Sequence, residues 1–576
     1  MMFPSRSLCF FCILCASAVS CFSLDREAFT FTNYDLQVRL EPAQRRLGVR
    51  GKITLRNHSS TPQKIVVLQI SSSLEWRAIT ISGKVPQFML RSYTSDIDHT
   101  GALSEAIVTL PQEIAPHGTV DLDIGYEGVI PMDATRLTRI GTPDDAAKSS
   151  DWDQIGPSFT AVRGIGYVAW YPIATESANL SEGDSLSEVL GRWQQREAGS
   201  TMHFKISVFR DDGVSPGQLV VNEPTCMVLY EAMGRPQAAS ADCTFQPLRL
   251  RVPSFAVGNY GTVTRPSITV FNLPTHAASA TAYADIAEQA ALLIANWFSS
   301  PPHKLQVADL PDPDAAPFGS GSLLLTPLAN DAPPSGLAAA YQMAHVAFWS
   351  PRPWIDDGLA HFAQALYLEQ EKGRQTALAY MAAHRGVLLQ IEGSTTDSDS
   401  AKRTGNSLVN TNDEIYMQSK AMSVWWMLRD MIGDAALKKA ISLYRPDQDH
   451  DPSYMPRLIE AQTQRDLSWF FDDWVYHDRG LPDFKVESAF AAKTVNGTYV
   501  VTVTVDNLGT AAAEVPVTVK FPGGEIGKRL EVQAKNRATI RVEIPAPPDE
   551  IVVNDGSVPE SDLSNNNFEI GAPQKQ

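Results

Sequence analysis

Several features that would point to a common protein class are missing from this sequence. The 576 residues hold 48 Lys and Arg against 65 Asp and Glu, a formal charge of −17, and no basic cluster stands out. A nucleic-acid partner is therefore poorly supported. Beyond the first 20 residues, no stretch is long and apolar enough to form a transmembrane helix. A Gly-x-Ser-x-Gly elbow, typical of many serine hydrolases, is also absent.

Cysteine is scarce in the body of the chain. Four of the six cysteines lie in or beside the first 21 residues, which leaves only Cys226 and Cys243. In an oxidising compartment, two remaining cysteines favour one disulfide. They flank Met227–Tyr230 and a Gly-Arg-Pro turn, so the bond would close a hairpin-like excursion. The alternative is a pair of buried free thiols.

The N-terminus indicates an exported protein. Arg6 precedes the apolar stretch Leu8–Val19, a pattern typical of a signal peptide, which we assign to residues 1–23. The tetrapeptide Ala18-Val19-Ser20-Cys21 loosely resembles the cleavage box of bacterial lipoproteins. The predicted location is periplasmic, cell-surface or secreted, with either a lipid anchor at Cys21 or free release.

Hydrophobic periodicity predicts a β-rich domain over residues 24–273. Runs that alternate like strands are Tyr34–Leu40, Lys64–Ile70 and Phe204–Phe209. Turn residues separate the runs at short intervals, which favours a β-sandwich or saddle.

The period then changes, and a mostly α-helical domain is predicted over 274–482. A polar interval from Gly393 to Asp413 interrupts it and is expected to be a surface loop. Trp425 and Trp426 are adjacent on a predicted helix, so we expect at most one of them to be fully buried.

Strand-like alternation returns over 483–556. Runs such as Tyr499–Val505 and Ala538–Glu543, with a turn at Gly523-Gly524, predict a small immunoglobulin-like β-sandwich. Residues 557–576 are expected to form a frayed tail. The predicted fold class is therefore α+β and multidomain.

One predicted helix, Ser335–Trp349, looks like the zinc helix of a metallopeptidase with part of its chemistry missing. A zincin places two histidines four residues apart on one helix face and a glutamate beside the first, which supplies two metal ligands and a general base. Here these positions read Tyr341, Gln342 and His345. Only the second histidine is present.

The order of these elements resembles the aminopeptidase N family of gluzincin metallopeptidases, also called the membrane alanyl aminopeptidase family. Trp354–Ala360 is similar to the family tract Leu-Asn-Glu-Gly-Phe-Ala, and Asp357 stands where its glutamate, the third zinc ligand, would be. Ser419–Asp434 is similar to the helix that begins Tyr-x-Lys-Gly-Ala, and the closing tract is matched by Phe470–Tyr476 and Gly480–Pro482. The resemblance implies a β-saddle, a thermolysin-like helical domain and a C-terminal β-sandwich.

The catalytic positions depart from the family pattern. A phenol is a poor zinc ligand because it must first ionise from a pKa of about 10, so Tyr341 is expected to pack and hydrogen-bond instead. Gln342 cannot serve as a general base, since an amide has no accessible basic site. The family's transition-state tyrosine falls at Gln418, and the nearest phenol, Tyr416, lies two residues earlier.

The remaining ligand positions are altered too. Asp357 is one methylene shorter than glutamate, and it follows His345 after fewer residues than the family uses, across the stiff segment Ser350–Pro353. The glutamate that would hold a peptide's amino group is missing from Phe318–Leu325. These losses together argue against hydrolysis by the family mechanism.

Two functional hypotheses follow. The favoured one is a catalytically inactive relative that binds a peptide or protein, or serves as a scaffold, and needs no cofactor. The alternative is a working zinc metallopeptidase with a relocated metal site formed by His345, Asp357 and His361. His361 lies four residues after Asp357, so both side chains can share one helix face.

Overall fold

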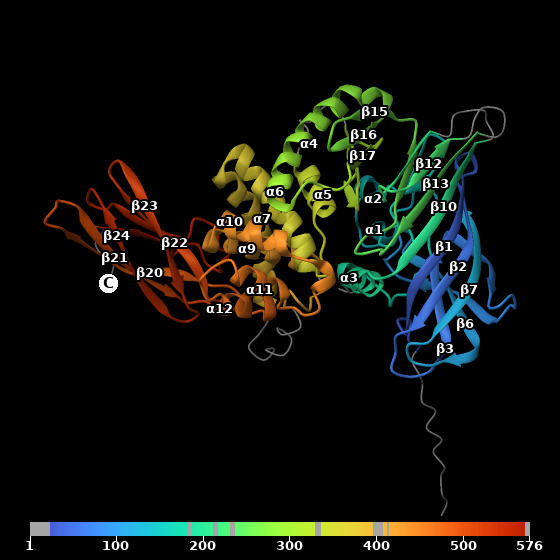
Figure 1. Cartoon of the computed structure of the whole chain (residues 1–576), viewed down its shortest axis with the longest axis horizontal. Helices are drawn as coiled ribbons and strands as arrows, with labels where there is room; N and C mark the ends of the chain where they lie inside the picture. The colour runs from blue at the N-terminus through green and yellow to red at the C-terminus, as the bar shows by residue number, and fades with distance from the viewer. Residues whose placement is uncertain are drawn as a thin grey trace, which may run out of the picture.

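β-Sheets at the two ends of the molecule flank a block of helices (Figure 1). The computed structural model describes residues 24–180, 186–210, 217–230, 237–328, 336–394, 407–411 and 414–570. The predicted signal peptide with Cys21, and most of the polar interval 393–413, lie outside the described residues. Within the described ranges, no helix has both the length and the apolar character that a membrane crossing requires.

Two sheets with a common core form the N-terminal part. Their strands are β1 Phe29–Glu41, β2 Arg46–Asn57, β3 Gln63–Ser71, β4 Leu74–Thr80, β5 Gln87–Thr94, β6 Ala102–Ile114, β7 Thr119–Val129, β10 Thr201–Arg210, β12 Met227–Tyr230 and β13 Gln237–Phe245. The strand orders are β12-β13-β10-β1-β2-β7-β4 and β3-β6-β5. Alternate side chains of β1 are buried between the sheets, because a strand directs successive side chains to opposite faces. The strand runs predicted here are confirmed.

Two smaller sheets connect the N-terminal part to the helices. One has the order β11-β14-β9-β8 and the other β15-β16-β17-β19-β18. The strands are β8 Gln154–Ile155, β9 Phe159–Val162, β11 Gln218–Val221, β14 Phe255–Gly258, β15 Gly261–Thr264, β16 Ile268–Asn272, β17 Leu305–Asp309, β18 Phe318–Ser320 and β19 Leu323–Thr326. The two sheets share a small apolar core. The predicted domain boundary at residue 273 falls within the second of these sheets. β15 and β16 precede this residue, and β16 pairs in parallel with β17, which follows it.

The predicted disulfide between Cys226 and Cys243 is confirmed, with the sulfur atoms bonded at 2.02 Å. Cys226 immediately precedes β12, and Cys243 lies in β13. These strands pair antiparallel, with Met227 opposite Asp242. The bond therefore joins neighbouring positions of one strand pair.

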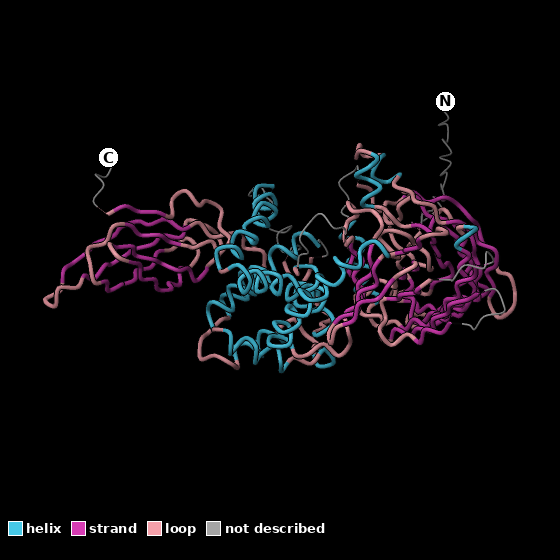
Figure 2. The backbone as a smooth tube through the Cα atoms, turned by 90° about the horizontal axis from the view of Figure 1, so that it is seen from above, coloured by secondary structure: helices cyan, strands magenta, loops and turns pink. Residues whose placement is uncertain are grey.

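Helices form the central part of the molecule (Figures 1 and 2). They are α4 Ala277–Phe298, α5 Leu337–Ala347, α6 Pro353–Lys372, α7 Arg374–Ser394, α9 Glu414–Ile432, α10 Asp434–Leu443, α11 Tyr454–Glu460 and α12 Ser468–Phe471, followed by a π-helical turn at Asp472–Tyr476. The short helices α1 Thr135–Thr138 and α2 Asp144–Ser150, and α3 Leu186–Glu197, belong to the N-terminal part. Among the central helices, α6 packs against α5, α7 and α9.

A glycine allows α6 and α9 to approach closely. A Cβ atom on Gly358 would lie 2.6 Å from the Cβ atom of Ala421 and 3.0 Å from Trp425 Nε1. The Trp425 indole stacks on Trp354, with ring centroids 5.3 Å apart, and donates a hydrogen bond to the Trp354 carbonyl at 3.2 Å. No residue with a side chain fits at position 358 without moving one of the helices.

Trp425 and Trp426 are both fully buried, so the expectation that at most one would be buried is wrong. Other elements enclose α9 on more than one side. Trp426 meets Phe362 edge-on, with ring centroids 6.3 Å apart. The guanidinium groups of Arg374 and Arg429 lie over its ring at 5.2 and 4.9 Å. These cations cover an indole that a surface helix would expose.

The C-terminal part consists of two facing sheets, β20-β21-β24 and β23-β22-β25-β26 (Figure 2). Their strands are β20 Phe484–Lys493, β21 Tyr499–Asn507, β22 Ala513–Phe521, β23 Gly524–Val532, β24 Arg537–Ile544, β25 Glu550–Val553 and β26 Asn567–Glu569. Alternate residues of β21 and β22 are buried in a core that continues into the helices. The strand runs predicted in this part are confirmed.

The segment predicted as a frayed tail, 557–576, is packed over its described residues, which end at 570. β26 pairs with β25. The buried carboxylate of Glu560 accepts hydrogen bonds from the backbone N–H of Phe484 at 3.0 Å and from the side-chain amides of Asn554 and Asn566. The prediction is therefore wrong for these residues, because the asparagines serve as donors to a buried acid.

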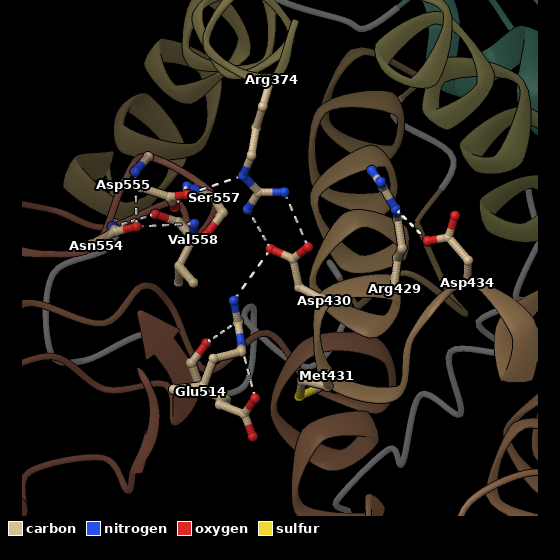
Figure 3. A network of polar contacts seen from close by, with 12 residues as sticks. Arg374, Arg429, Asp430, Met431, Asp434, Glu514, Asn554, Asp555, Ser557 and Val558 are labelled. Atoms are coloured by element: carbon tan, nitrogen blue, oxygen red, sulfur yellow. Dashed lines mark hydrogen bonds and ion pairs between the residues drawn. The ribbon is translucent and has the colours of Figure 1, made fainter. Parts of the chain in front are cut away.

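An ion-pair network joins the helices to the C-terminal sheets (Figure 3). Arg374 donates to both oxygens of Asp430 on α9, at 3.2 and 2.7 Å, and to Asp555 at 3.1 Å. Arg529 of β23 reaches Asp430 at 3.3 Å and Glu514 at 2.8 Å. The Asp430 side chain is only 10% exposed. One nearly buried carboxylate thus bridges two partly buried guanidinium groups, each of which also pairs with a second acid.

Replacing Asp430 is expected to destabilise the protein. Asp430→Ala should lower the free energy of unfolding by about 2–3 kcal/mol, because it leaves two arginines without their shared counter-charge. Chemical denaturation at pH 7 measures this. Asp434→Ala is the control: Asp434 pairs with Arg429 at 2.8 Å but is 50% exposed. We expect it to cost less than about 1 kcal/mol. Equal losses in the two variants would contradict a special role for Asp430.

Candidate functional site

A cleft of about 360 Å³ opens between the N-terminal part and the helices. Its walls come from the segments that follow β9 and β13, β18 with the β18–β19 turn, and helices α3, α5, α6 and α9. Pockets of this size can hold part of a peptide. Of the predicted site residues, Gln342, His345 and Asp357 line the cleft, whereas His361 and Tyr416 do not.

Helices α5 and α6 bring the predicted residues together. α5 is rich in alanine, the best helix former, and ends at Phe348, whose backbone is extended (φ −134°, ψ 145°). α6 starts at Pro353, where the missing backbone N–H has no helical partner to lose. Because the link between them is short, the two helices pack side by side. Tyr341 on α5 therefore faces Asp357 on α6.

Tyr341 packs and hydrogen-bonds as predicted. Its hydroxyl donates to Asp357 Oδ1. Its ring meets the His345 ring edge to face, with centroids 4.7 Å apart, and lies 5.0 Å from the His361 ring. A neutral phenol thus stands where the family resemblance places the first histidine ligand.

His345 lies between two carboxylates. Its Nδ1 is 3.2 Å from Asp356 Oδ2, and its Nε2 is 3.5 Å from Asp357 Oδ1. The backbone N–H of Ser350 donates to Asp356 Oδ1 at 2.7 Å and fixes that carboxylate. Burial lowers the pKa of His345, but the hydrogen bonds and charges of both aspartates outweigh burial and raise it to about 10. The raised pKa favours the imidazolium form of His345 at neutral pH, and in that form neither ring nitrogen has a lone pair for a metal.

Gln342 connects α5 to the β18–β19 turn. Its Nε2 donates a hydrogen bond to the Gly321 carbonyl, and the residue is 1% exposed. A Cβ atom on Gly319 would lie 2.0 Å from Gln342 Oε1, so this close approach requires glycine. Oε1 itself has no hydrogen-bond partner in the described parts of the chain. The amide acts as a structural donor at the position where the family resemblance places a general base.

His361 approaches the other oxygen of Asp357. Its Nε2 is 3.6 Å from Asp357 Oδ2, and neither atom has a hydrogen-bond partner among the described residues. Its Nδ1 is 3.0 Å from Gln364 Oε1, which also accepts a bond from the Tyr380 hydroxyl at 2.8 Å. Burial lowers the pKa of His361, the charge of Asp357 opposes this, and the charge of His345 reinforces it. The net pKa is lowered, so His361 is neutral at pH 7.

The donor atoms do not fit a zinc ion in this arrangement. Among the described residues, no group of three or more His, Cys, Asp or Glu side chains is placed to hold a metal. Oδ1 of Asp357 faces Tyr341 and His345, whereas Oδ2 faces His361. The two histidines therefore approach different oxygens of the Asp357 carboxylate, and the Tyr341 hydroxyl occupies one of these oxygens with a hydrogen bond. Protonated His345 would first have to lose its proton.

Tyr416 belongs to a separate contact outside the cleft. The residue is 3% exposed, and its hydroxyl accepts a hydrogen bond from Lys420 Nζ at 2.9 Å. Lys420 also donates to Asp478 at 2.9 Å. The contact ties α9 to the segment before β20. Tyr416 thus does not face the other predicted site residues.

Solved structures with a similar fold include an M1 zinc metallopeptidase from Deinococcus radiodurans, which is 16% identical in sequence. The match covers 80% of this chain and 97% of that chain, with a TM-score of 0.50. The chain has an M1 metallopeptidase-like fold. Aminopeptidase A of Legionella pneumophila, in complex with aspartic acid, is also similar: it is 12% identical, with a TM-score of 0.59, over 92% of this chain and 59% of that one. No family model matches the sequence, and no curated protein matches it.

Sequence reasoning missed several residues around the site of this M1-like fold. Asp356 holds His345, Gly321 receives the Gln342 amide, and Tyr380 completes the surroundings of His361. The adjacent acids at the start of α6 were the available signal for Asp356. Gly321 and Tyr380 come near the site only through folding, and no local pattern marks them.

Restoring a glutamate at position 342 is expected to weaken the fold. In Gln342→Glu, a carboxylate oxygen replaces the N–H donor and meets the Gly321 carbonyl, which should cost about 2 kcal/mol at pH 7. This environment raises the pKa of the introduced acid, so the loss should shrink as the pH falls toward 4. Denaturation at pH 7 and pH 5 measures both effects. A variant as stable as the wild type at pH 7 would rule out the structural role.

The protonation of His345 gives a second prediction. Its folded pKa of about 10 lies above an unfolded value of about 6.5. Its ion pairs therefore stabilise the fold fully below pH 6.5, and this stabilisation is lost as the pH rises through 10. The stability difference between wild type and His345→Gln should be largest near pH 6 and smallest near pH 10. A difference that stays constant over this range would show that His345 is not an imidazolium.

Proposed function

We propose that this chain is an exported, catalytically inactive relative of the M1 zinc metallopeptidases, of the aminopeptidase N type, whose cleft binds a peptide segment. One observation carries the proposal. The side chains at the positions of the first zinc ligand and the general base, Tyr341 and Gln342, are both hydrogen-bond donors to protein acceptors. Neither can accept a proton from a water molecule at neutral pH.

Peptide binding is supported by an open strand edge in the cleft. Within the described part of the chain, β18 is an edge strand that pairs with β19 alone, and its residues Phe318, Gly319 and Ser320 line the cleft. An extended peptide can add to such an edge through main-chain hydrogen bonds, with its side chains in neighbouring pockets. A bound peptide would then run past Gln342 and His345 without meeting a base.

The domain roles are part of the proposal. We assign 24–273 as a β-saddle, 274–482 as a thermolysin-like domain and 483–556 as an immunoglobulin-like sandwich that supports it. The continuous core and the Asp430 network between the helices and the last two sheets support a rigid scaffold. The disulfide supports export, because such bonds persist in oxidising compartments.

A second candidate function has one observation in its favour. Asp357 Oδ2 and His361 Nε2 are buried, unpaired and 3.6 Å apart, as two ligands of a relocated zinc site could be. A metal would also require His345 to lose its proton and turn from Asp357 toward the same point. The chemistry supplied by such a zinc ion would be polarisation of a peptide carbonyl.

Metal analysis and activity measurements on the purified mature protein separate the two functions. We expect less than stoichiometric zinc and no chelator-sensitive hydrolysis of a panel of aminoacyl and peptide substrates, with saturable binding of the same peptides by calorimetry. Stoichiometric zinc together with chelator-sensitive turnover would overturn the inactive assignment, provided that His345→Ala abolishes the turnover. His450→Ala, an exposed histidine away from the cleft, is the matched control.

A further inference from the structure

Arg249 presents an unused charge in the cleft wall. It lies in the loop between β13 and β14 and lines the cleft. Its side chain has no hydrogen bond or ion pair with the described residues, and its Nε is buried without a partner. A buried guanidinium nitrogen without an acceptor is costly, and such groups usually mark a missing partner.

Trp349 forms the other half of this wall. It follows α5 and also lines the cleft. The Arg249 guanidinium lies 4.6 Å from the centre of its ring, a cation–π contact between the two side chains. The Trp349 indole Nε1 is also buried without a hydrogen-bond partner among the described residues. Two unpaired donors thus meet where the N-terminal part faces the helices.

The neighbouring Arg251 shows that this arrangement is not a general property of the loop. Arg251 pairs with Glu223 at 2.5 Å, and it donates to the carbonyls of Pro247 and Leu248 at 2.9 and 3.1 Å. All parts of its guanidinium are therefore used by the protein. Arg251 therefore anchors the loop through contacts within the protein, whereas the Arg249 side chain has no hydrogen bond or ion pair with the described residues.

The backbone at Arg249 also favours a specific role for its side chain. Its φ is +61°, in the left-handed region that L residues with a Cβ rarely adopt. A hydrogen bond from its N–H to the Ala198 carbonyl at 2.7 Å helps to hold this conformation. Strained positions of this kind gather at ligand sites, where they aim a side chain.

We infer that Arg249, held by Trp349, binds a carboxylate group of the peptide that occupies the cleft. The inference rests on the proposed peptide-binding function and names the ligand class, a peptide with a carboxylate. A planar guanidinium matches a carboxylate with two parallel hydrogen bonds. The carboxylate belongs either to the C-terminus of a short peptide or to a Glu or Asp side chain, because both present the same group.

Calorimetric titration of the mature protein with matched peptides distinguishes these sources. Tetra-alanine is compared with its C-terminal amide, and Ala-Ala-Glu-Ala amide with Ala-Ala-Gln-Ala amide. We expect one carboxylate-bearing member to bind about tenfold or more tightly than its partner. Arg249→Met should remove this preference, and Arg249→Lys should restore part of it, because lysine keeps the charge without the fork. Arg541→Met, an exposed arginine of β24, should change nothing.

Each result has one meaning. A preference for the free C-terminus that depends on Arg249 assigns the site to a peptide end, and a preference for glutamate that depends on Arg249 assigns it to an acidic side chain. If the peptides bind without a carboxylate preference, or with one that survives in Arg249→Met, the inference is overturned while peptide binding stands. If no peptide binds, the proposed function fails, and the inference fails with it.

Discussion

A buried carboxylate must be neutralised or hydrogen-bonded by its neighbours, and the interior around Asp357 is organised to meet this requirement. The hydroxyl of Tyr341 and the charged ring of His345 reach one oxygen, and His361 approaches the other. A zinc ion would supply positive charge to an acid at this place in an active metallopeptidase. Here the imidazolium of His345 supplies positive charge, and the neutral phenol of Tyr341 supplies a hydrogen bond. The acid is thus stabilised by hydrogen bonds and charge from side chains of its own chain.

The two sides of the cleft carry different electrostatic roles. On the helical side, Asp356 and Asp357 are neutralised in part by His345, so their charges are internal to the protein. On the opposite side, the loop after β13 carries Arg249, whose side chain has no hydrogen bond or ion pair with the described residues, although the charges of Asp356 and Glu223 act on it. The inferred contact with a ligand carboxylate therefore lies on the N-terminal wall.

Much of the local structure could be predicted from the sequence, because periodicity reports directly which face of an element is buried. Periodicity predicted the strand runs in β1, β3 and β21 and the helix around Tyr341, and the two cysteines that remain beyond residue 21 indicated the disulfide. Contacts between distant segments left no such pattern. The Gln342 bond to Gly321 and the partners of Glu560 depend on how elements meet in three dimensions.

Similar reasons explain the wrong predictions. Trp425 and Trp426 cannot both be buried by one packed face, but α9 is enclosed by several elements and by arginine side chains. The Asn-rich end has the composition of a solvated tail, yet its amides satisfy a buried acid. The sequence spacing of His345, Asp357 and His361 did not predict how their side chains meet. The two histidines approach different oxygens of the Asp357 carboxylate.

Gly358 immediately follows Asp357, and it sets the distance between α6 and α9 by the absence of a single carbon atom. The packing of α6 against α9 therefore fixes the position of the Asp357 carboxylate, whatever that carboxylate binds. Mutations at positions 341 and 342 can change the chemistry of the cleft while this helix contact remains untouched. The packing of α6 against α9 and the chemistry of the cleft are thus set by different residues, so one can change while the other stays as it is.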